Sequence, residues 1–303
     1  MSRPPSASTE QPVPGRTRSQ ALAYYELTKP GIAGFAMITA GVAYYVASAG
    51  DAGLVPVFHT LLGTVLATAG ALALNQYIER KADALMERTR TRPLPSGRLR
   101  PRDALLFGLL LVVGGVAHLW ATVGEVPAIL TLLSAGTYNL VYTPLKPRSH
   151  TATFAGAVPG AMPALIGWSA ATGGVGPGAL VLFGIAFLWQ IPHVLSLAWL
   201  LREDYARAGF LMMPPTSPDG RFIGSQMVLY SAALLPVSLF PTPLGLTGWI
   251  YLIGAAVLGT VFLWWSIAAS RSMDRTAVRR VFLGSLAYQP LLLGLMLLDT
   301  VRN

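Results

Sequence analysis

Three oxygen-bearing side chains recur at every fourth residue near the end of a long apolar run. Asn75, Glu79 and Asp83 occupy positions i, i+4 and i+8. On a helix this spacing places them along one face, because four residues advance the chain by about one turn. Their oxygens suit Mg²⁺, which is commonly held by one or two carboxylates together with substrate phosphates. The alternative is an ordinary helix end whose charged residues pair with their neighbours on the next turn.

Basic residues follow this acidic stripe directly. Arg88, Arg90 and Arg92 precede a stiff turn at residues 93–97 that contains two prolines. Guanidinium groups bind phosphate oxygens through paired hydrogen bonds. Carboxylates for a metal and arginines for an anion in one segment predict a site for a metal-bridged diphosphate. The simpler alternative is that these arginines only hold the loop on one side of a membrane.

Two further polar clusters lie near the ends of apolar segments. Tyr138 and Tyr142 are again four residues apart, and Lys146 lies one step further along. This set is typical of a wall that faces a cation and a phosphate, although interfacial tyrosines also serve as membrane anchors. His193 lies within an apolar segment, where an ionisable group suggests function, with a satisfied core histidine as the alternative, and Asp204 follows it. Acids at two helix ends are what two metal ions on one diphosphate would require.

The composition indicates that the bilayer is the solvent for this chain. Hydrophobic residues make up 53% of its 303 residues and charged residues only 12%, about half the charge of a soluble domain. The absence of cysteine excludes disulfides and thiolate chemistry. Residues 1–20 lack the apolar core of a secretory signal and are predicted to form a disordered cytoplasmic tail. Residues 21–303 are predicted to form a single transmembrane domain.

Runs of roughly 20 mostly apolar residues predict nine membrane-spanning helices in an all-α integral membrane protein. The nine segments are 31–49, 54–78, 104–123, 126–143, 151–171, 178–200, 223–240, 247–269 and 281–298. With nine spans, all of the 22 Lys and Arg residues except Arg302 fall on the side of the N-terminus. The positive-inside rule therefore predicts a cytoplasmic N-terminus and cytoplasmic long loops. Nucleic acid is not an expected partner, because these basic residues lie at helix ends that face anionic headgroups.

Four stretches of the sequence resemble the UbiA superfamily of membrane prenyltransferases. They are LTKPGI at 27–32, NQYIERKADALMERTRTRPLPSGRL at 75–99, YNLVYTPLKPRSHTATFAGAVPGAMPALIGW at 138–168 and FLWQIPHVLSLAWLLREDYARAGFLMMP at 187–214. The parts MERTRTRPLP, AMPALIGW and WQIPH are similar to the branch of the superfamily that modifies haem. This resemblance implies transfer of a farnesyl group from farnesyl diphosphate to a vinyl group of haem B, with addition of water, giving haem O and diphosphate.

The resemblance also implies a location and a set of partners. It implies a UbiA-type bundle of nine helices in a bacterial inner membrane, with its active site on the cytoplasmic side. Mg²⁺ is the implied cofactor, and haem B, farnesyl diphosphate and membrane lipid are the implied partners. A haem A synthase is the expected downstream partner, since it would consume haem O.

Roles for individual residues follow from the same resemblance. The residues that match its two catalytic motifs are Asn75, Glu79, Asp83, His193 and Asp204. Those expected to bind the metal are Asn75, Glu79, Asp83 and Asp204. Those expected to bind the diphosphate are Arg88, Arg90, Arg92, Lys146, Tyr138 and Tyr142.

Two stretches depart from the pattern of the haem branch, and other functions remain open. Val194 and Leu195 stand where an aromatic pair is usual, and Gly-Phe-Leu stands at 209–211. An aromatic quinone precursor or a chlorin is therefore the alternative acceptor. A transporter is a further alternative, but its polar residues would be expected at the bilayer midplane rather than at one rim. The last alternative function is that of a non-enzymatic assembly factor for an oxidase.

Overall fold

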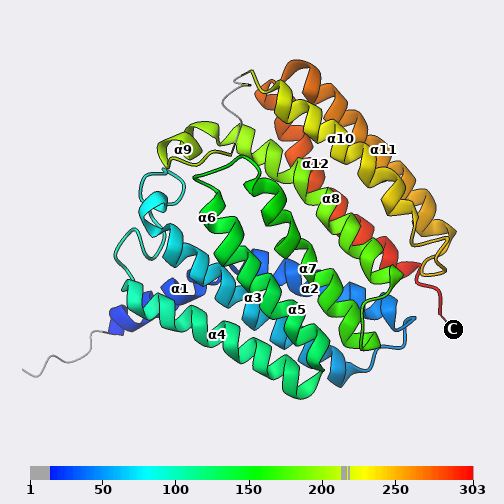
Figure 1. Cartoon of the computed structure of the whole chain (residues 1–303), viewed down its shortest axis with the longest axis horizontal. Helices are drawn as coiled ribbons and strands as arrows, with labels where there is room; N and C mark the ends of the chain where they lie inside the picture. The colour runs from blue at the N-terminus through cyan, green and yellow to red at the C-terminus, as the bar shows by residue number, and fades with distance from the viewer. Residues whose placement is uncertain (1–13, 213–216, 218, 303) are drawn as a thin grey trace, which may run out of the picture.

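The computed structural model describes residues 14–212, 217 and 219–302, and the regular elements of this part are helices (Figure 1). In chain order they are α1 (Pro14–Leu27), α2 (Pro30–Ala47), α3 (Leu54–Asp83), α4 (Pro101–Thr122), α5 (Glu125–Gly136), the π-helix η1 (Thr137–Tyr142), α6 (Thr143–Leu145), α7 (Ala152–Thr172), α8 (Pro177–Leu200), α9 (Arg202–Arg207), α10 (Arg221–Leu239), α11 (Trp249–Ser272) and α12 (Arg275–Leu298). The predicted all-α architecture is confirmed.

Eight of the helices in the described part of the chain are long and apolar enough to cross a membrane. They are α2, α3, α4, α7, α8, α10, α11 and α12. The remaining predicted span, 126–143, corresponds to α5, η1 and α6, which follow one another without a loop but are each short. Eight predicted segments are thus confirmed as helices of sufficient length and apolarity to span a membrane, and the count of nine crossings stays a prediction.

The π-helical turn has a local cause at the end of this divided segment. Pro144 has no backbone N–H to continue the α-helical ladder. The Thr143 backbone N–H, just before it, bonds to the Tyr138 carbonyl five residues earlier, and the Thr143 hydroxyl donates to the same carbonyl at 2.8 Å. Such π turns are frequent at functional sites, and this one carries both Tyr138 and Tyr142.

The first helix begins inside the predicted disordered tail. Residues 14–20 belong to α1, and residues 1–13 lie outside the described part. Helix formation here has a tertiary cause, because Ala23 and Leu27 are fully buried against Leu94 and Leu99 of the loop between α3 and α4. Arg98 in that loop also pairs with Glu26 at 2.5 Å. These contacts are made by the second half of α1, and the disorder of residues 1–20 stays a prediction.

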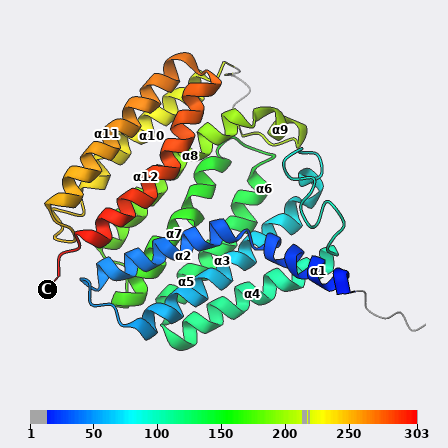
Figure 2. The same cartoon turned by 180° about the vertical axis from the view of Figure 1, so that it is seen from behind.

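Helices from both the N-terminal and the C-terminal half of the sequence surround one large cavity. Its volume is about 570 Å³, and α2, α3, α5, η1, α7, α8 and α12 all contribute lining residues. Helix α4 packs on the outside of α3, while α10 and α11 pack outside α8 and α12. Figures 1 and 2 accordingly show α4 at one edge of the bundle and the α10–α11 pair at the other.

Helix α7 is adapted to the cavity by two internal prolines, Pro159 and Pro163. Pro163 cannot donate to the Pro159 carbonyl four residues earlier. The Ser134 hydroxyl of α5 donates to that carbonyl instead, at 3.2 Å. A polar side chain of the neighbouring helix thus satisfies a backbone group that the bilayer could not hydrate.

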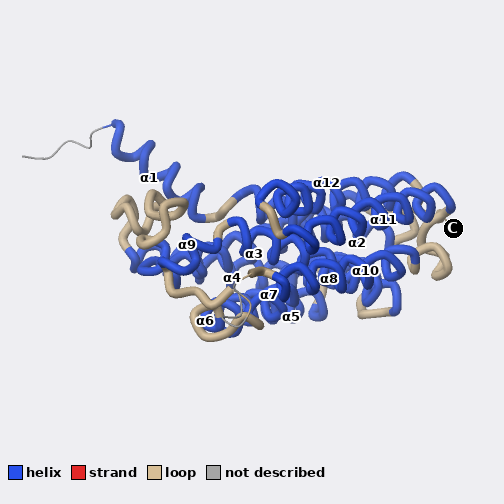
Figure 3. The backbone as a smooth tube through the Cα atoms, turned by 90° about the horizontal axis from the view of Figure 1, so that it is seen from above, coloured by secondary structure: helices blue, strands red, loops and turns tan. Residues whose placement is uncertain are grey.

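The loop that follows α3 and the short helix α9 lie at one end of the bundle. Figure 3 shows α1 standing away from the other helices at this same end. The polar clusters identified in the sequence belong to these elements or to the helix ends beside them.

Candidate active site

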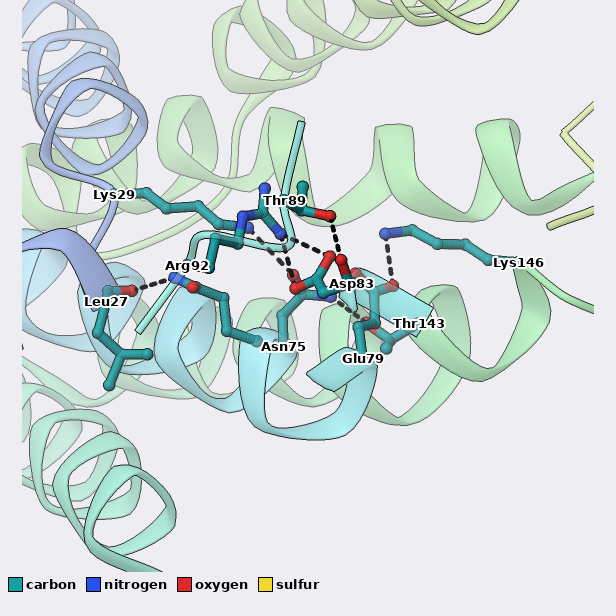
Figure 4. Close-up of polar contacts among 10 residues, drawn as sticks. Leu27, Lys29, Asn75, Glu79, Asp83, Thr89, Arg92, Thr143 and Lys146 are labelled. Atoms are coloured by element: carbon teal, nitrogen blue, oxygen red, sulfur yellow. Dashed lines mark hydrogen bonds and ion pairs between the residues drawn. The ribbon is translucent and has the colours of Figure 1, made fainter. Parts of the chain in front are cut away.

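The three predicted metal ligands of α3 share one buried face. Asn75, Glu79 and Asp83 are 1%, 7% and 0% exposed. Because the last turn of α3 is closed over by the loop that follows it, this polar face is turned inward rather than toward water. Figure 4 shows the side chains directed toward a common group of basic residues. The predicted one-sided stripe is confirmed as a geometric feature.

Each carboxylate of this stripe is paired with a cation, Glu79 with one that is distant in the sequence and Asp83 with one from the loop that follows α3. Lys146 Nζ lies 2.6 Å from Glu79 Oε1. Arg92 Nη1 donates to both oxygens of Asp83, at 2.8 Å each. The Thr89 hydroxyl donates to the Asp83 carbonyl at 2.8 Å, which holds the loop over the helix end (Figure 4). The acids and bases of two sequence clusters therefore meet in one place.

Asn75 joins a third cation to the same cluster. Its Oδ1 accepts a hydrogen bond from Lys29 Nζ at 3.2 Å, and its Nδ2 donates to the Thr143 hydroxyl at 3.0 Å (Figure 4). The next residue, Gln76, donates from Nε2 to the Leu27 carbonyl at 2.8 Å. These bonds fix the start of α2 against α3 and hold Lys29 against Asn75.

The cluster carries more basic than acidic groups. Lys29, Lys146 and Arg92 face two carboxylates. Burial, together with the charges of Arg92 and Lys146, lowers the pKa of Lys29 to about 7. Burial also opposes the charge of Lys146, but Tyr142 and Glu79 raise its pKa above the usual value. A shielded site with surplus positive charge is suited to an anion.

Aromatic rings continue from the basic cluster into the cavity. Lys146 Nζ lies 4.5 Å from the centroid of the Tyr142 ring, and the rings of Tyr142 and Tyr138 are 5.4 Å apart. Both tyrosines line the cavity, together with Trp189 of α8. The two tyrosines and the lysine thus lie side by side as predicted. Lys146 belongs to the polar cluster, and Tyr138 and Tyr142 line the cavity.

The donor set of the cluster fits a divalent cation that is shared with a substrate. The described residues contain no group of three His, Cys, Asp or Glu side chains that could hold a metal on their own. Glu79 and Asp83 supply buried carboxylate oxygens, and Asn75 supplies an amide oxygen. Mg²⁺ accepts such incomplete protein shells, because phosphate oxygens and water complete its coordination.

Asp204 lies beside this cluster on α9. Its Oδ1 accepts a hydrogen bond from the Glu87 backbone N–H at 3.3 Å and forms an ion pair with Arg207. Burial opposes ionisation of Asp204, but the bonds from Arg207 and Glu87 lower its pKa overall, with help from Arg88. The carboxylate is therefore anchored to the loop that follows α3.

The predicted arginines differ in position. Arg92 contacts Asp83, whereas Arg88 and Arg90 have exposed side chains and form no ion pair among the described residues. Arg88 lies near Asp204, as its effect on that pKa indicates. The structure therefore brings Arg92 into the cluster and leaves Arg88 and Arg90 at its solvent side.

His193 occupies the wall of the cavity rather than the acidic cluster. Its ring is stacked between Trp189 at 5.2 Å and Phe282 at 5.1 Å, measured between ring centroids. Its Nδ1 lies 2.8 Å from the Ser285 hydroxyl oxygen of α12. The histidine thus lies at the apolar end of the site and does not contact the oxygen donors Asn75, Glu79 and Asp83.

Three residues of the site were not identified from the sequence. Lys29 and Thr143 lie within stretches that carry the family resemblance but were given no role there, and Ser285 lies outside those stretches. The available signals are weak: Lys29 directly precedes Pro30 at the start of a span, and Ser285 is a hydroxyl within a long apolar run. Only the packing of α2 and α12 against the cavity reveals their positions.

Comparison with known proteins identifies relatives over almost the whole chain. The UbiA prenyltransferase family matches residues 36–289. A protoheme IX farnesyltransferase of Solibacter usitatus is 43% identical over 285 residues, covering 91% of this chain and 98% of that protein. The protein of the same name from Salinibacter ruber is 41% identical over 276 residues, covering 91% and 98%.

Solved structures share the fold at low sequence identity. A structure of digeranylgeranylglyceryl phosphate synthase matches with a TM-score of 0.75 and 17% identity, over 92% of this chain and 98% of that one. A UbiA homologue from Archaeoglobus fulgidus bound to GPP and Mg²⁺ matches with a TM-score of 0.58 and 14% identity, over 90% and 99%. At such identities the likeness establishes the fold alone.

Proposed function

This chain belongs to the UbiA prenyltransferase family, and on that basis we propose that it transfers a farnesyl group from farnesyl diphosphate to a vinyl group of haem B, with addition of water, to give haem O and diphosphate. One observation carries the proposal: a buried cluster of acids and bases adjoins, through Lys146 and the Tyr142 ring, an apolar cavity of about 570 Å³. The names of its relatives in Solibacter and Salinibacter support haem as the acceptor.

The charged end of the site binds the diphosphate in this proposal. The residues that would hold Mg²⁺ are Asn75, Glu79, Asp83 and Asp204. The metal, when bound, neutralises charge that develops on the leaving diphosphate. Arg92, Lys146 and Lys29 add positive charge from inside the cluster, and Arg88 and Arg90 approach from the solvent side.

The apolar end holds the prenyl chain and the reacting carbon. Departure of the diphosphate leaves an allylic cation, which must be kept from water until the acceptor is in place. The faces of Tyr138, Tyr142 and Trp189 line the cavity, and aromatic faces stabilise a cation electrostatically. Substrate binding is thus divided between a polar end and an aromatic one.

The membrane arrangement is part of the same proposal. The divided segment α5–η1–α6 completes nine crossings, so that the N-terminus, the loop after α3 and α9 all face the cytoplasm of a bacterial inner membrane. Farnesyl diphosphate then reaches the site from the cytoplasmic rim. A haem A synthase is the proposed consumer of the product.

The test is a mass-spectrometric assay of the detergent-purified chain with haem B, farnesyl diphosphate and Mg²⁺. We expect a haem product that is heavier by one farnesyl group and one water. The matched control is Asp83→Asn, which should give no product while the protein stays folded. Diphosphate release with a quinone precursor or a chlorin, and none with haem, would overturn the acceptor. No turnover with any acceptor would overturn the prenyltransferase proposal itself.

A further inference from the structure

The hydrogen bonds of Ser285 determine where the single proton of a neutral His193 ring resides. The Ser285 hydroxyl donates to the Phe282 carbonyl at 2.6 Å. A hydroxyl has one proton, so its oxygen can only accept from His193 Nδ1 at 2.8 Å. The imidazole therefore carries its proton on Nδ1 and its lone pair on Nε2.

The surroundings of the ring leave this lone pair free. His193 lines the cavity, and its Nε2 has no hydrogen-bond partner among the residues that the structure describes. The rings of Trp189 and Phe282 lie nearly parallel to the imidazole, at interplanar angles of 16° and 25°. Ser285 is itself held by the Trp189 indole N–H, which donates to its carbonyl at 2.8 Å. The stacking contacts with Trp189 and Phe282 and the hydrogen bond at Nδ1 thus fix the orientation of the imidazole.

This is the arrangement that protein metal sites use for a histidine ligand. A ligating imidazole almost always donates its second N–H to an oxygen acceptor, which fixes the tautomer and makes the free nitrogen more basic. No acid lies in the apolar part of the cavity to share the lone pair or to complete a site for a bare cation. A metal that brings its own equatorial ligands is the group that a single histidine can hold here.

We propose that His193 Nε2 is an axial ligand to the iron of the porphyrin acceptor, and that Ser285 is the positioning residue that keeps this nitrogen unprotonated. The inference rests on the proposed function, since the iron arrives with the haem substrate. Coordination forms one Fe–N bond and breaks the bond between the iron and the water molecule that it displaces. The oxidation state of the iron does not change. It would fix the position of the iron, and so of the porphyrin centre, relative to His193.

The experiment compares ferric haem with metal-free protoporphyrin IX on the same variants in detergent. We expect the wild type to show the absorption and electron paramagnetic resonance spectra of a nitrogen-ligated haem. His193→Ala should lose this signature and bind haem about tenfold or more weakly, with unchanged affinity for the metal-free porphyrin. His193→Gly should regain the signature when imidazole is added, which also shows that the variant is folded.

Two further variants separate positioning from general packing. Ser285→Ala should weaken haem binding by about tenfold, whereas Ser285→Thr, which keeps the hydroxyl, should restore it. His118→Ala removes a half-buried histidine of α4 that does not line the cavity, and it should change nothing.

The outcomes distinguish this inference from the proposed function. A wild type that farnesylates haem without a nitrogen-ligated spectrum, or a His193→Ala variant that keeps the spectrum, overturns the ligation and leaves the reaction standing. Loss of turnover in His193→Ala with an unchanged haem spectrum would assign His193 to proton transfer instead. Ligation through His193 without any farnesylation supports the inference and overturns the reaction. A wild type that neither binds nor modifies haem overturns both.

Discussion

Lys146 Nζ lies 2.6 Å from Glu79 Oε1, and the two side chains are only 12% and 6% exposed. An ion pair so shielded from water contributes little net stability, because desolvation of both charges offsets their attraction. Its residues come from different polar clusters of the sequence, and together they form the base of the proposed diphosphate site. When the substrate arrives with Mg²⁺, we expect Lys146 to turn to the anion and Glu79 to the metal, so that neither charge is left unpaired.

Removing one member of this pair should separate stability from catalysis. Glu79→Gln leaves Lys146 as an uncompensated charge, and breaking such a pair costs about 3–5 kcal/mol. We expect a lower melting temperature and no turnover. The double variant Glu79→Gln/Lys146→Met carries no orphan charge, so it should recover the melting temperature but not the activity. Recovery of both would show that the pair is only structural.

The loop arginines offer a matched comparison. Arg92 contacts Asp83 at 2.8 Å, whereas Arg90 is exposed. We expect Arg92→Ala to lower kcat/KM by about 100-fold, as is typical when one donor to a developing negative charge is lost. Arg90→Ala should cost much less. Equal losses in steady-state assays with varied farnesyl diphosphate would mean that the loop rearranges to bring both arginines onto the substrate.

Affinity for the diphosphate should fall as the pH rises through neutrality. Burial, with the charges of Arg92 and Lys146, lowers the pKa of Lys29 to about 7, so this lysine is charged below pH 7 and neutral above it. One lost positive charge weakens anion binding by at most about tenfold for each pH unit above the pKa. Isothermal titration with a non-hydrolysable farnesyl diphosphate analogue from pH 6 to 9 measures this. Lys29→Arg stays charged and should flatten the profile, and a slope that persists in this variant would assign the dependence elsewhere.

The wall of the cavity should not tolerate a methyl group at Gly156. A Cβ there would lie 2.7 Å from the Tyr142 ring, so Gly156→Ala must displace the ring that lies beside Lys146. We expect at least a tenfold loss of kcat with little change in thermal stability. Gly294→Ala, where a Cβ meets nothing within 4 Å, is the control for helix propensity. Equal activity in the two variants would exclude a role for the position of Tyr142.

The absence of cysteine makes the topology directly measurable. In the nine-span arrangement, Ser96→Cys lies in the cytoplasm and Val175→Cys faces the periplasm. A membrane-impermeant maleimide added to intact cells should therefore label only Val175→Cys. If the divided segment α5–η1–α6 does not cross the membrane, residue 175 falls on the cytoplasmic side and remains unlabelled until the cells are opened.

Local patterns in the sequence determined a large part of this protein. Apolar runs of spanning length predict the long helices, because the bilayer requires every backbone group to be satisfied within its own helix. The spacing of Asn75, Glu79 and Asp83 predicts that they share one face of a helix, because helix periodicity alone determines which residues lie on the same face. The position of α1 is different: Ala23, Glu26 and Leu27 contact a loop some 70 residues away in the chain, and no local pattern predicts these contacts.

The tertiary structure decided which groups meet. Nothing in the sequence pairs Lys29 with Asn75 or Ser285 with His193, since each contact joins helices far apart in the chain. The three arginines of one short segment likewise have equal standing in the sequence, and only the fold of the loop directs Arg92 onto Asp83. Residue types and periodicity fix the chemistry that is available on each helix, but distances between helices depend on packing, which short-range pattern does not encode.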